Sequence, residues 1–287
     1  MSRSRQPVAG RTVLITGAAR GIGAEAARRL AAAGARIALV GLEPERMAAL
    51  ADELPDAAWF EADVTDRAQL ARAVDAAAAR FGGLDVVIAN AGVAGVGTVE
   101  RMDPDAFERI IEVNLLGVWR TLRCALPHVI ERRGYVLAIA SLAAAVHSPL
   151  MAPYTASKAG VEALADAMRL ELEGHGVAVG VAYFGFIETD MVRDAFDHPS
   201  TTVLRRGLGA LSKPAPISAA GKAILRGVEQ RARRVVAPRS ILPLLHAPRA
   251  AAPLLEAIQR RGGAAEAIAA ANAPDGLSHP AARPREL

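Results

Sequence analysis

Tyr154 and Lys158 have the residue types and the spacing of a proton-exchanging pair, and Ser141 stands thirteen residues before the tyrosine. Residues four apart share one face of a helix, so we expect the phenol and the ammonium to point into the same space. A cation beside a tyrosine favours the phenolate and lowers the pKa of the phenol from its ordinary value of about 10. Such a group can exchange a proton with an alcohol near neutral pH.

The composition makes this pair conspicuous. Only three of the 34 lysines and arginines are lysines, and the chain has only three tyrosines, yet one of each stands here. A bare Tyr-x-x-x-Lys is more often a surface lysine beside a half-buried tyrosine. The catalytic interpretation therefore depends on the elements that would position the pair.

Length and composition favour one domain. A chain of 287 residues, 52% of them hydrophobic, can form one large core or two smaller ones. No break in composition precedes about residue 240, so we expect a domain over residues 8–238 and a basic, proline-interrupted extension over 239–287. The lone Cys124 excludes an internal disulfide, leaves nothing for a zinc cluster and fits a reducing, cytoplasmic setting, and we expect no metal. We expect neither a secretory signal nor a membrane span.

Short apolar or β-branched runs alternate with helical patterns along the chain. Strands are expected at 12–16, 36–40, 58–61, 84–89, 135–140 and 177–183, with helices between them that include 22–33, 44–54, 66–80 and 153–173. Strands that are apolar on both faces belong to a parallel sheet covered by helices on both sides. Right-handed crossovers then give a doubly wound α/β sheet of about seven strands, a Rossmann-type single domain.

A glycine-rich turn joins the first expected strand to the first helix. Gly17, Gly21 and Gly23 let the backbone approach a pyrophosphate at the positive end of that helix. The spacing is Gly-x-x-x-Gly-x-Gly, not the commoner Gly-x-Gly-x-x-Gly. The position of the turn between strand and helix favours a dinucleotide site.

Two polar clusters follow the third and fourth strands, at the edge where open α/β sheets bind ligands. Asp63 and Val64 form the first, and Asn90, Ala91 and Gly92 form the second. Turn chemistry alone explains such residues, because Asn and Asp favour loops. For Asp63 both interpretations stay open, whereas for the second cluster we favour ligand binding.

Together these residues resemble the pattern of the short-chain dehydrogenase/reductase family over about residues 8–238. The resemblance implies an NAD(P)-dependent enzyme that transfers a hydride between nicotinamide and a secondary alcohol or ketone. It implies that Tyr154 is the acid/base, that Lys158 lowers its pKa and holds the nicotinamide ribose, and that Ser141 steadies the substrate oxygen. Asn114 would anchor a water that connects Lys158 to solvent.

The resemblance also implies the cofactor contacts. Where a proline is usual, the chain has Phe184, which puts local rigidity in doubt, and where a serine is frequent before Ser141 it has Ala140. The implied contacts are Gly17, Gly21, Ile22 and Gly23 for the pyrophosphate, Asp63 and Val64 for the adenine, Asn90, Ala91 and Gly92 for the adenosine ribose side, and Gly185, Ile187 and Thr189 for the nicotinamide.

The expected cofactor is NADP, with NAD left open. An acidic residue at the end of the second strand would bind the ribose hydroxyls of NAD and repel a 2′-phosphate. That position is Gly41, while Arg20 and Arg46 are candidate partners for the phosphate. Against this, Glu43 lies nearby, and Arg20 is equally explained as a solvated loop cation.

Substrate specificity is expected in segments 142–151 and 191–212, the second of which belongs to a substrate loop over about 191–215. His147 is interpreted as a loop histidine rather than a substrate contact. The expected pocket walls are apolar and favour a lipophilic small-molecule alcohol or ketone over a phosphorylated sugar; they are Leu142, Val146, Phe184, Phe186, Met191 and Phe196.

The C-terminal part is basic. Residues 222–261 include nine basic and two acidic residues and are too interrupted to span a membrane. This stretch could pack on a partner subunit, extend over the substrate site or touch an anionic surface, and residues 264–287 are expected to be a weakly ordered tail. The basic charges are scattered and no nucleic-acid motif is present, so no nucleic-acid partner is expected.

A homo-oligomer is expected, a tetramer rather than a dimer, with 222–261 near a second interface. The family resemblance implies contacts between symmetry-related helices at about 105–124 and 153–173. Small residues on the second helix would permit close packing: Ala159, Gly160, Ala163, Ala165 and Ala167. A methyltransferase has no use for the serine, tyrosine and lysine. A non-catalytic dinucleotide-binding regulator on the same fold remains the alternative, which a turnover assay separates from an enzyme.

Overall fold

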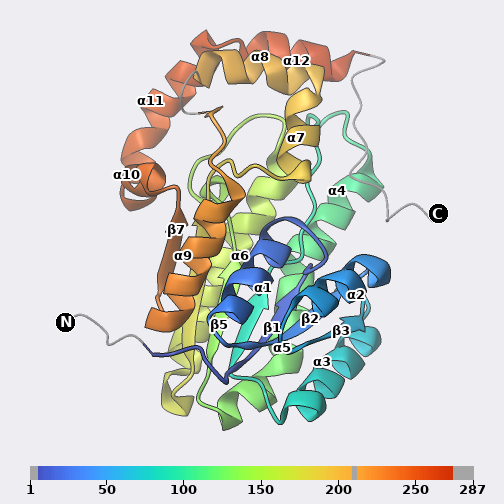
Figure 1. The fold of residues 1–287 in the computed structure, drawn as a ribbon. Helices are drawn as coiled ribbons and strands as arrows, with labels where there is room; N and C mark the ends of the chain where they lie inside the picture. The colour runs from blue at the N-terminus through green and yellow to red at the C-terminus, as the bar shows by residue number, and fades with distance from the viewer. Residues whose placement is uncertain (1–5, 209–211, 274–287) are drawn as a thin grey trace.

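The computed structural model describes residues 6–208 and 212–273, and its centre is a seven-stranded sheet (Figure 1). The strand order is β3-β2-β1-β4-β5-β6-β7, and all neighbouring strands are parallel. This confirms the doubly wound α/β fold. The strands are β1 (Thr12–Thr16), β2 (Arg36–Gly41), β3 (Ala57–Glu61), β4 (Val86–Ala89), β5 (Tyr135–Ile139), β6 (Ala178–Phe184) and β7 (Arg234–Ala237).

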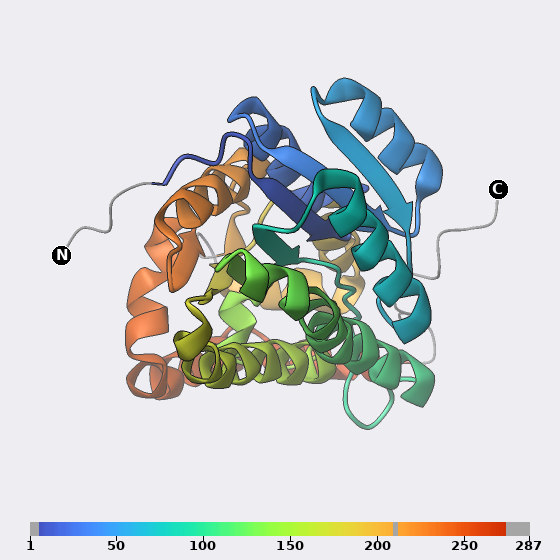
Figure 2. The same ribbon diagram turned by 90° about the horizontal axis from the view of Figure 1, so that it is seen from below.

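Helices cover both faces of the sheet, as the view from below in Figure 2 makes plain. On one face lie α1 (Gly21–Ala32), α2 (Pro44–Glu53) and α9 (Ile217–Gln230), and on the other lie α3 (Arg67–Phe81), α5 (Gly117–Glu131) and α6 (Ala152–Glu171). Neighbouring residues of one strand feed two separate cores, since Leu14 packs with the second set of helices and Val13 and Ile15 with the first. This two-sided burial explains why the central strands β1, β4 and β5 are apolar throughout.

The predicted boundaries of the strands and of α1, α2, α3 and α6 agree with the structure to within about two residues because turn and cap residues fix them. Asp66, for example, precedes α3 and accepts hydrogen bonds from the backbone N–H groups of Ala68 and Gln69 (2.9 and 3.0 Å). The same helix ends at Gly82, which adopts the left-handed conformation (φ +73°) that glycine tolerates. The helix expected at about 105–124 instead continues to Glu131, and the loop expected over about 191–215 contains two helices, Asp190–Asp197 and Pro199–Leu208.

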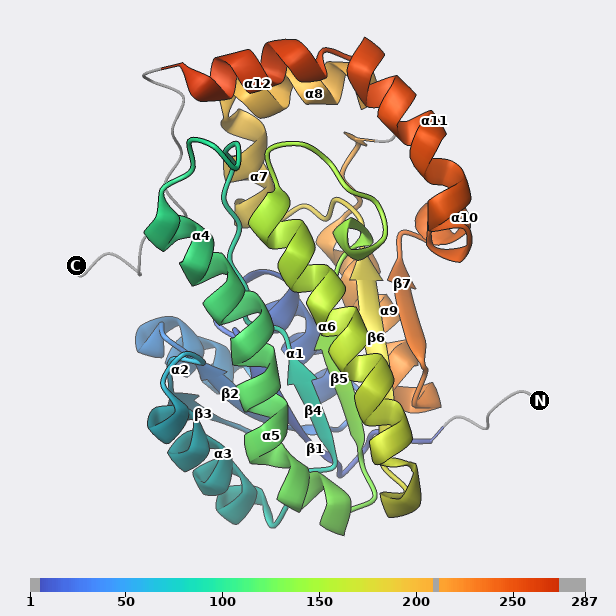
Figure 3. The ribbon, with the colours of Figure 1, turned by 180° about the vertical axis from the view of Figure 1, so that it is seen from behind.

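The remaining helices gather at the carboxyl edge of the sheet (Figures 1 and 3). α4 (Pro104–Ile111) continues into α5 through a π-helical turn (Glu112–Leu116). α7 (Asp190–Asp197) and α8 (Pro199–Leu208) follow β6, and α10 (Leu242–His246), α11 (Pro248–Arg261) and α12 (Ala264–Asn272) follow β7. Single 3₁₀ turns are formed by Leu142–Ala144, Glu173–His175 and Arg239–Ile241.

The C-terminal segment returns across the top of the molecule, where α12 lies along α8 (Figure 3). The expectation of a weakly ordered tail from residue 264 is wrong for 264–272. Ala264, Ala267 and Ala271 are buried, and they recur at helical spacing on one face. This face packs against α8 and the loop after β4, and the alanines pack with Val96, Leu150 and Leu204. Residues 274–287 lie outside the described residues.

Within residues 6–208 and 212–273, no helix combines the length and the apolar character that crossing a membrane requires.

Candidate active site

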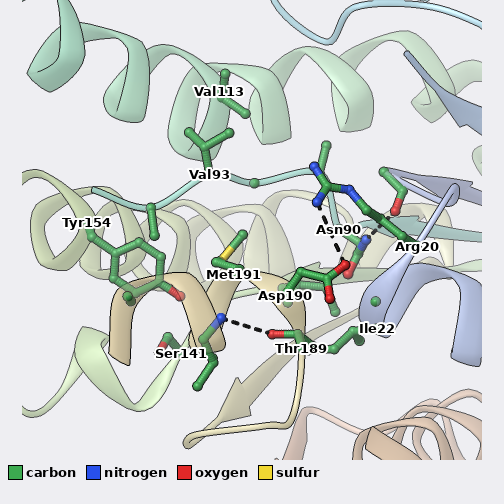
Figure 4. Close-up of a pocket in the computed structure, with 18 of the residues that line it drawn as sticks. Arg20, Ile22, Asn90, Val93, Val113, Ser141, Tyr154, Thr189, Asp190 and Met191 are labelled. Carbon is green, nitrogen blue, oxygen red and sulfur yellow. Dashed lines mark hydrogen bonds and ion pairs between the residues drawn. The ribbon is translucent and has the colours of Figure 1, made fainter. Parts of the chain in front are cut away.

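A cavity of about 490 Å³ opens at the carboxyl edge of the sheet (Figure 4). Tyr154 and Ser141 lie at one end of it, and Arg20 and Ile22 of the glycine turn lie at the other. The cavity brings together most of the site residues expected from the sequence: Gly17, Arg20, Gly21, Ile22, Gly41, Asp63, Val64, Asn90, Ala91, Gly92, Ser141, Tyr154, Lys158, Gly185, Ile187 and Thr189. Gly23 and Asn114 do not line it.

Ser141, Tyr154 and Lys158 converge from two elements. Ser141 follows β5, and its hydroxyl accepts a hydrogen bond from the N–H of Ala143 (3.1 Å) and donates to the carbonyl of Phe184 (3.3 Å). Tyr154 and Lys158 lie in the first two turns of α6, and Lys158 Nζ is 5.6 Å from the centroid of the phenol ring. The ammonium donates to the carbonyl of Ile139 at 2.8 Å, so the end of β5 holds both the serine and the lysine.

Burial dominates the protonation of this pair. It raises the pKa of Tyr154 above its ordinary value, with the nearby Ser141 hydroxyl acting in the opposite direction. Burial also lowers the pKa of Lys158 to about 8. The expectation of a lowered Tyr154 pKa is therefore wrong for this structure, because the desolvation of the phenol outweighs the opposing hydrogen bond with Ser141.

Asn114 lies behind the cavity and organises its floor. The π-helical turn between α4 and α5 carries it into the interior, where its side chain is fully buried. Its side-chain amide forms two bonds with the backbone of Val93, accepting from the N–H (2.8 Å) and donating to the carbonyl (2.9 Å). It also donates to the Ser157 hydroxyl at 3.3 Å. Asn114 thus fixes the loop after β4 that passes Lys158.

The glycine turn is packed too closely to accept side chains. A Cβ added at Gly23 would lie 2.3 Å from the Gly17 carbonyl oxygen, and one at Gly17 would lie 2.8 Å from the Ala91 Cα. Gly17 and Gly21 also have positive φ angles (+64° and +58°). Asn90 closes the turn by donating to the carbonyls of Thr16 and Gly17 (3.0 and 3.1 Å). Gly23 therefore shapes the cavity without lining it.

The end of β2 and its neighbours form a charged cluster. Arg20 and Arg46 both pair with Glu43, at 3.0 and 3.1 Å, while Gly41 supplies no side chain. Asp63 binds the backbone N–H of Thr65 (2.8 Å) and pairs with Arg109 (3.2 Å). Burial acts to raise the pKa of Asp63, but these partners outweigh it, and the pKa lies below its usual value. Asp63 thus makes turn contacts and lines the cavity.

Hydrogen bonds fix the loop after β6, although Phe184 stands where a proline is usual. The N–H of Gly185 donates to the carbonyl of Ala237 (3.0 Å), which ties this loop to β7. Thr189 is the N-cap of α7, where its hydroxyl accepts from the N–H of Val192 (3.3 Å) and donates to the Ile187 carbonyl (3.3 Å).

The end of the cavity at Ser141 and Tyr154, the substrate end, is lined mostly by other residues than those predicted from the sequence. Of the six expected walls, Phe184 and Met191 line the cavity. Leu142, Val146, Phe186 and Phe196 do not: Phe186 and Phe196 pack on each other with ring centroids 5.0 Å apart, and Val146 lines a second cavity together with His147. The apolar lining comes instead from the loop after β4, the π-helical turn and α7, namely Val93, Ala94, Gly95, Val96, Val113, Val192 and Ala195.

Sequence reasoning also missed polar residues of the lining, among them Arg109, Asp194 and His198. No local motif marks Arg109, because the residue with which it pairs, Asp63, lies 46 positions earlier in the sequence. Asp194 and His198 stand within the segment 191–212 that was singled out for specificity, and only the fold shows which of its residues reach the cavity.

The sequence of this chain is similar to those of known dehydrogenases. A model of the family described as short chain dehydrogenase matches residues 11–200. The 3-alpha-(or 20-beta)-hydroxysteroid dehydrogenase of Mycobacterium bovis is 34% identical over 73% of this chain and 80% of its own length. The trans-4-hydroxycyclohexanecarboxylate dehydrogenase of Sinomonas cyclohexanicum is 35% identical over 74% and 82%.

A solved structure shows the same fold. A short chain dehydrogenase/reductase from Burkholderia phymatum, in complex with NAD, superimposes with a TM-score of 0.76 and 21% identity, over 86% of this chain and 96% of that one.

Proposed function

The chain belongs to the short-chain dehydrogenase family and is an NAD(P)-dependent oxidoreductase of alcohol and carbonyl groups, and from this premise we propose the roles of its residues. The observation that carries the proposal is that Ser141, Tyr154 and Lys158 meet in the cavity that the glycine turn also lines. Gly17 and Gly23 stand where a Cβ would be blocked by backbone, which fits a turn that a dinucleotide approaches closely.

The bound nicotinamide would supply the hydride chemistry. Tyr154 donates a proton to the carbonyl oxygen of a ketone, or accepts one from an alcohol. Ser141 donates a hydrogen bond to the same oxygen and steadies its developing charge. Lys158 places a cation beside the phenol and would hold a ribose hydroxyl of the cofactor. Asn114 positions the loop at residue 93 and would connect Lys158 to solvent through a water.

Replacement of Tyr154 by Phe tests this assignment. Turnover should fall by about 10²–10⁴-fold or more, because only the proton exchange is removed. Binding of NADPH, followed by its fluorescence, should stay within about twofold. Tyr183→Phe is the matched control, since the Tyr183 hydroxyl bonds Glu162 (2.6 Å) and lines the second cavity. Unimpaired turnover by Tyr154→Phe would contradict the mechanism.

For the cofactor we infer NADP rather than NAD. Gly41 offers no carboxylate to bind a ribose 2′-hydroxyl or repel a 2′-phosphate. Glu43, two residues after this position, already pairs with both Arg20 and Arg46, and Arg20 also lies 4.0 Å from Asp190, which pairs with Arg193. Three guanidinium groups against two carboxylates leave a net positive cluster, which suits a phosphate better than a neutral hydroxyl. A higher kcat/KM with NADPH than with NADH is the expected result, and the reverse would contradict it.

For the substrate we infer a lipophilic secondary alcohol or ketone. The support is the apolar lining contributed by Val93, Val96, Val113 and Met191 around the Ser141–Tyr154 end. Both relatives are named for hydroxylated cyclic compounds, a hydroxysteroid and a hydroxycyclohexanecarboxylate. Steady-state turnover of cyclic and acyclic ketones of matched size, with a phosphorylated sugar as the contrasting compound, tests this inference.

We also propose that residues 239–273 complete the substrate site of the domain at 8–238. Val96 and Ala195 line the cavity and also pack in the cluster that α12 forms with α8. Thr98 and Asn272 add a hydrogen bond of 2.6 Å between the loop after β4 and the end of α12. These contacts are made by α12, which follows the basic segment 222–261, and α11 of that segment packs on the same helix α8.

Assembly and location remain proposals. On α5, α6 and the π-helical turn, the exposed residues include Trp119 (38%) and Leu170 (76%) as well as Leu116, Ala163 and Ala167, whereas Ala165 is buried within its own subunit. We infer that this face forms the helix contact of a homotetramer with closed symmetry, and that 222–261 lies near its second interface. Sedimentation tests this inference, and an active 30 kDa species would contradict it. The single free Cys124 supports a cytoplasmic location.

A further inference from the structure

The order of the strand ends along the cavity indicates where the adenine half of a bound dinucleotide lies. Ser141 follows β5, the glycine turn follows β1, and Gly41 and Asp63 lie at or just after the ends of β2 and β3. With the nicotinamide beside Ser141 and the pyrophosphate on the glycine turn, the adenine half lies on the far side of that turn, over β2 and β3. Asp63 lines the cavity there.

Two neighbours hold the Asp63 carboxylate in one orientation. Thr65 donates to its Oδ1 twice, from the backbone N–H (2.8 Å) and from the hydroxyl (2.7 Å). Arg109 donates to its Oδ2 at 3.2 Å. The same guanidinium also donates to the Thr65 hydroxyl oxygen at 3.1 Å, so the three side chains form a closed ring of hydrogen bonds. The carboxylate cannot rotate without breaking one of them.

Arg109 reaches this ring from a distant part of the chain. It lies in the last turn of α4, a helix whose residues Ala106 and Ile110 are buried. Its side chain is 33% exposed and lines the same cavity as Asp63. An ion pair with this much exposure adds little to stability, so replacing Arg109 should leave the fold intact.

One acceptor position of the Asp63 carboxylate remains open. An ionised carboxylate offers about four lone-pair sites, of which Thr65 occupies two and Arg109 one among the described residues. Burial acts to raise the pKa of Asp63, but the hydrogen bonds from Thr65 and the charge of Arg109 outweigh it and hold the pKa below its usual value. The carboxylate is therefore ionised at neutral pH, and it suits a ligand group that donates a hydrogen bond.

The 6-amino group of adenine is such a donor. Hypoxanthine carries an oxygen at the same position of the ring, and a carbonyl oxygen only accepts. Facing Asp63, this oxygen would leave two acceptors opposed without a proton between them. A carboxylate held in place distinguishes the two bases better than one that rotates freely, because its orientation is fixed before the base arrives.

We infer that Arg109 is a positioning residue for adenine recognition, which fixes the Asp63 carboxylate so that its open acceptor takes a hydrogen bond from the 6-amino group. Arg109 acts through Asp63 and not on the base itself. This inference rests on the proposed function, because it concerns how the same cavity binds its cofactor. The family resemblance implies that Asp63 faces the adenine, and the role of Arg109 follows from the contacts described above.

Binding tests this inference without any turnover. Calorimetry gives the Kd of NADP⁺, NAD⁺ and their hypoxanthine analogues for wild type, Arg109→Met and Arg109→Lys. Met removes the charge and both hydrogen bonds but keeps an unbranched chain, whereas Lys keeps the charge without the planar fork. Arg28→Met is the matched control, since Arg28 pairs with Glu53 at 2.9 Å and is not among the residues that line the cavity.

Wild type should bind the adenine dinucleotides at least about tenfold more tightly than the hypoxanthine analogues, the equivalent of one hydrogen bond of about 1.4 kcal/mol. In Arg109→Met this ratio should fall to about twofold, because the Kd of the adenine forms rises while that of the analogues stays within about twofold. Arg109→Lys should give an intermediate ratio, and Arg28→Met the wild-type ratio. An unchanged ratio in Arg109→Met overturns the inference. So does an equal rise of Kd for both bases, which is the mark of a merely structural role.

Asp63→Ala separates an action through Asp63 from a direct contact of Arg109 with the base. This variant should lose the discrimination between the two bases, and adding Arg109→Met to it should reduce adenine binding no further, as expected of two residues that act as one unit. A further loss of adenine binding in the double variant would show that Arg109 contacts the base, and it would overturn the positioning role.

ADP and inosine diphosphate separate this inference from the proposed function, because both lack the nicotinamide. If no alcohol or ketone is turned over, yet ADP is preferred and the preference falls in Arg109→Met, the proposed function fails and the role of Arg109 stands. If turnover is normal but the preference for adenine is the same in Arg109→Met, the role of Arg109 fails and the function stands. Failure to bind any of these nucleotides would refute both.

Discussion

Lys158 imposes a stability cost on the fold, and replacing it by Met should reveal that cost. The side chain is only 4% exposed, and burial lowers its pKa from 10.5 to about 8. A difference of this size corresponds to roughly 3 kcal/mol of unfavourable free energy for carrying the charge in the folded state. Met keeps an unbranched apolar chain of similar length and removes the charge.

The expected effect depends on pH. Below about pH 8 both states carry the charge, so the folded wild type bears the full cost. Between about pH 8 and 10.5 the unfolded chain binds more protons than the folded one, so wild-type stability rises with pH, and above 10.5 the cost is gone. The variant also leaves the Ile139 carbonyl without its donor, which costs about 1–2 kcal/mol at any pH.

Combining these terms, Lys158→Met should be more stable than wild type by about 1–2 kcal/mol at pH 7 and less stable by about the same amount near pH 10.5. Its turnover should be abolished at both pH values. Urea unfolding, without cofactor and at equal protein concentration, measures the difference, and Lys222→Met at an exposed position of α9 controls for the loss of a lysine. A difference in stability that stays constant from pH 7 to pH 10 would refute the reasoning.

Three further outcomes are expected. Gly41→Asp should shift the ratio of kcat/KM toward NADH by at least about tenfold, since the nearest atom to its Cβ is the flexible Met47 Sδ at 3.2 Å and the nearest backbone atom is at 3.8 Å; an unchanged ratio would count against the NADP assignment. Ala267→Glu should raise KM for the ketone several-fold and leave the NADPH Kd within about twofold, because the residue is fully buried against α8, far from the glycine turn; an equal loss of both affinities would contradict the role given to α12. Alcohol oxidation should accelerate as pH rises above neutral, because it needs the phenolate, whereas ketone reduction should hold its rate up to at least about pH 10, because burial raises the pKa of the Tyr154 phenol; parallel pH profiles in the two directions would exclude the phenol as the group that titrates.

The fold and the cofactor end were predictable because backbone geometry specifies them. Gly17 and Gly23 stand where any Cβ would collide with neighbouring backbone, so their types and spacing are visible in the sequence. Strands buried on both faces likewise read as apolar runs, and caps such as Asp66 mark where helices begin.

The protonation state of the catalytic pair was not predictable from spacing. The Tyr-x-x-x-Lys spacing brings the two side chains together, and from this alone a lowered tyrosine pKa follows. In the structure, the direction in which the Tyr154 pKa moves depends on the burial of the phenol. The lysine ammonium, in turn, donates its hydrogen bond to the carbonyl of Ile139 in β5. Both facts arise from contacts between segments that are distant in the sequence.

The substrate end was predicted least well for the same reason. Aromatic residues of the segment after the sixth strand were predicted as walls around Tyr154, yet Phe186 and Phe196 pack on each other. The residues that line the cavity instead come from the loop after β4 and from α7. An apolar residue in a loop has no period that tells which way it faces, so this arrangement could not be derived from local pattern.

These two ends of the cavity are therefore held by different parts of the chain. The end of β5 and the start of α6 hold the three proposed catalytic groups, and burial lowers the pKa of the lysine there to about 8. Val96, Ala195 and His198, which touch the substrate end, depend on α8 and through it on α12, beyond the segment that the family model matches. On the proposal that α12 completes the substrate site, changes in α12 should alter which alcohol is accepted without disturbing Tyr154 and Lys158. A chain that keeps its chemistry constant while it acquires a new substrate would be expected to vary first in these C-terminal helices.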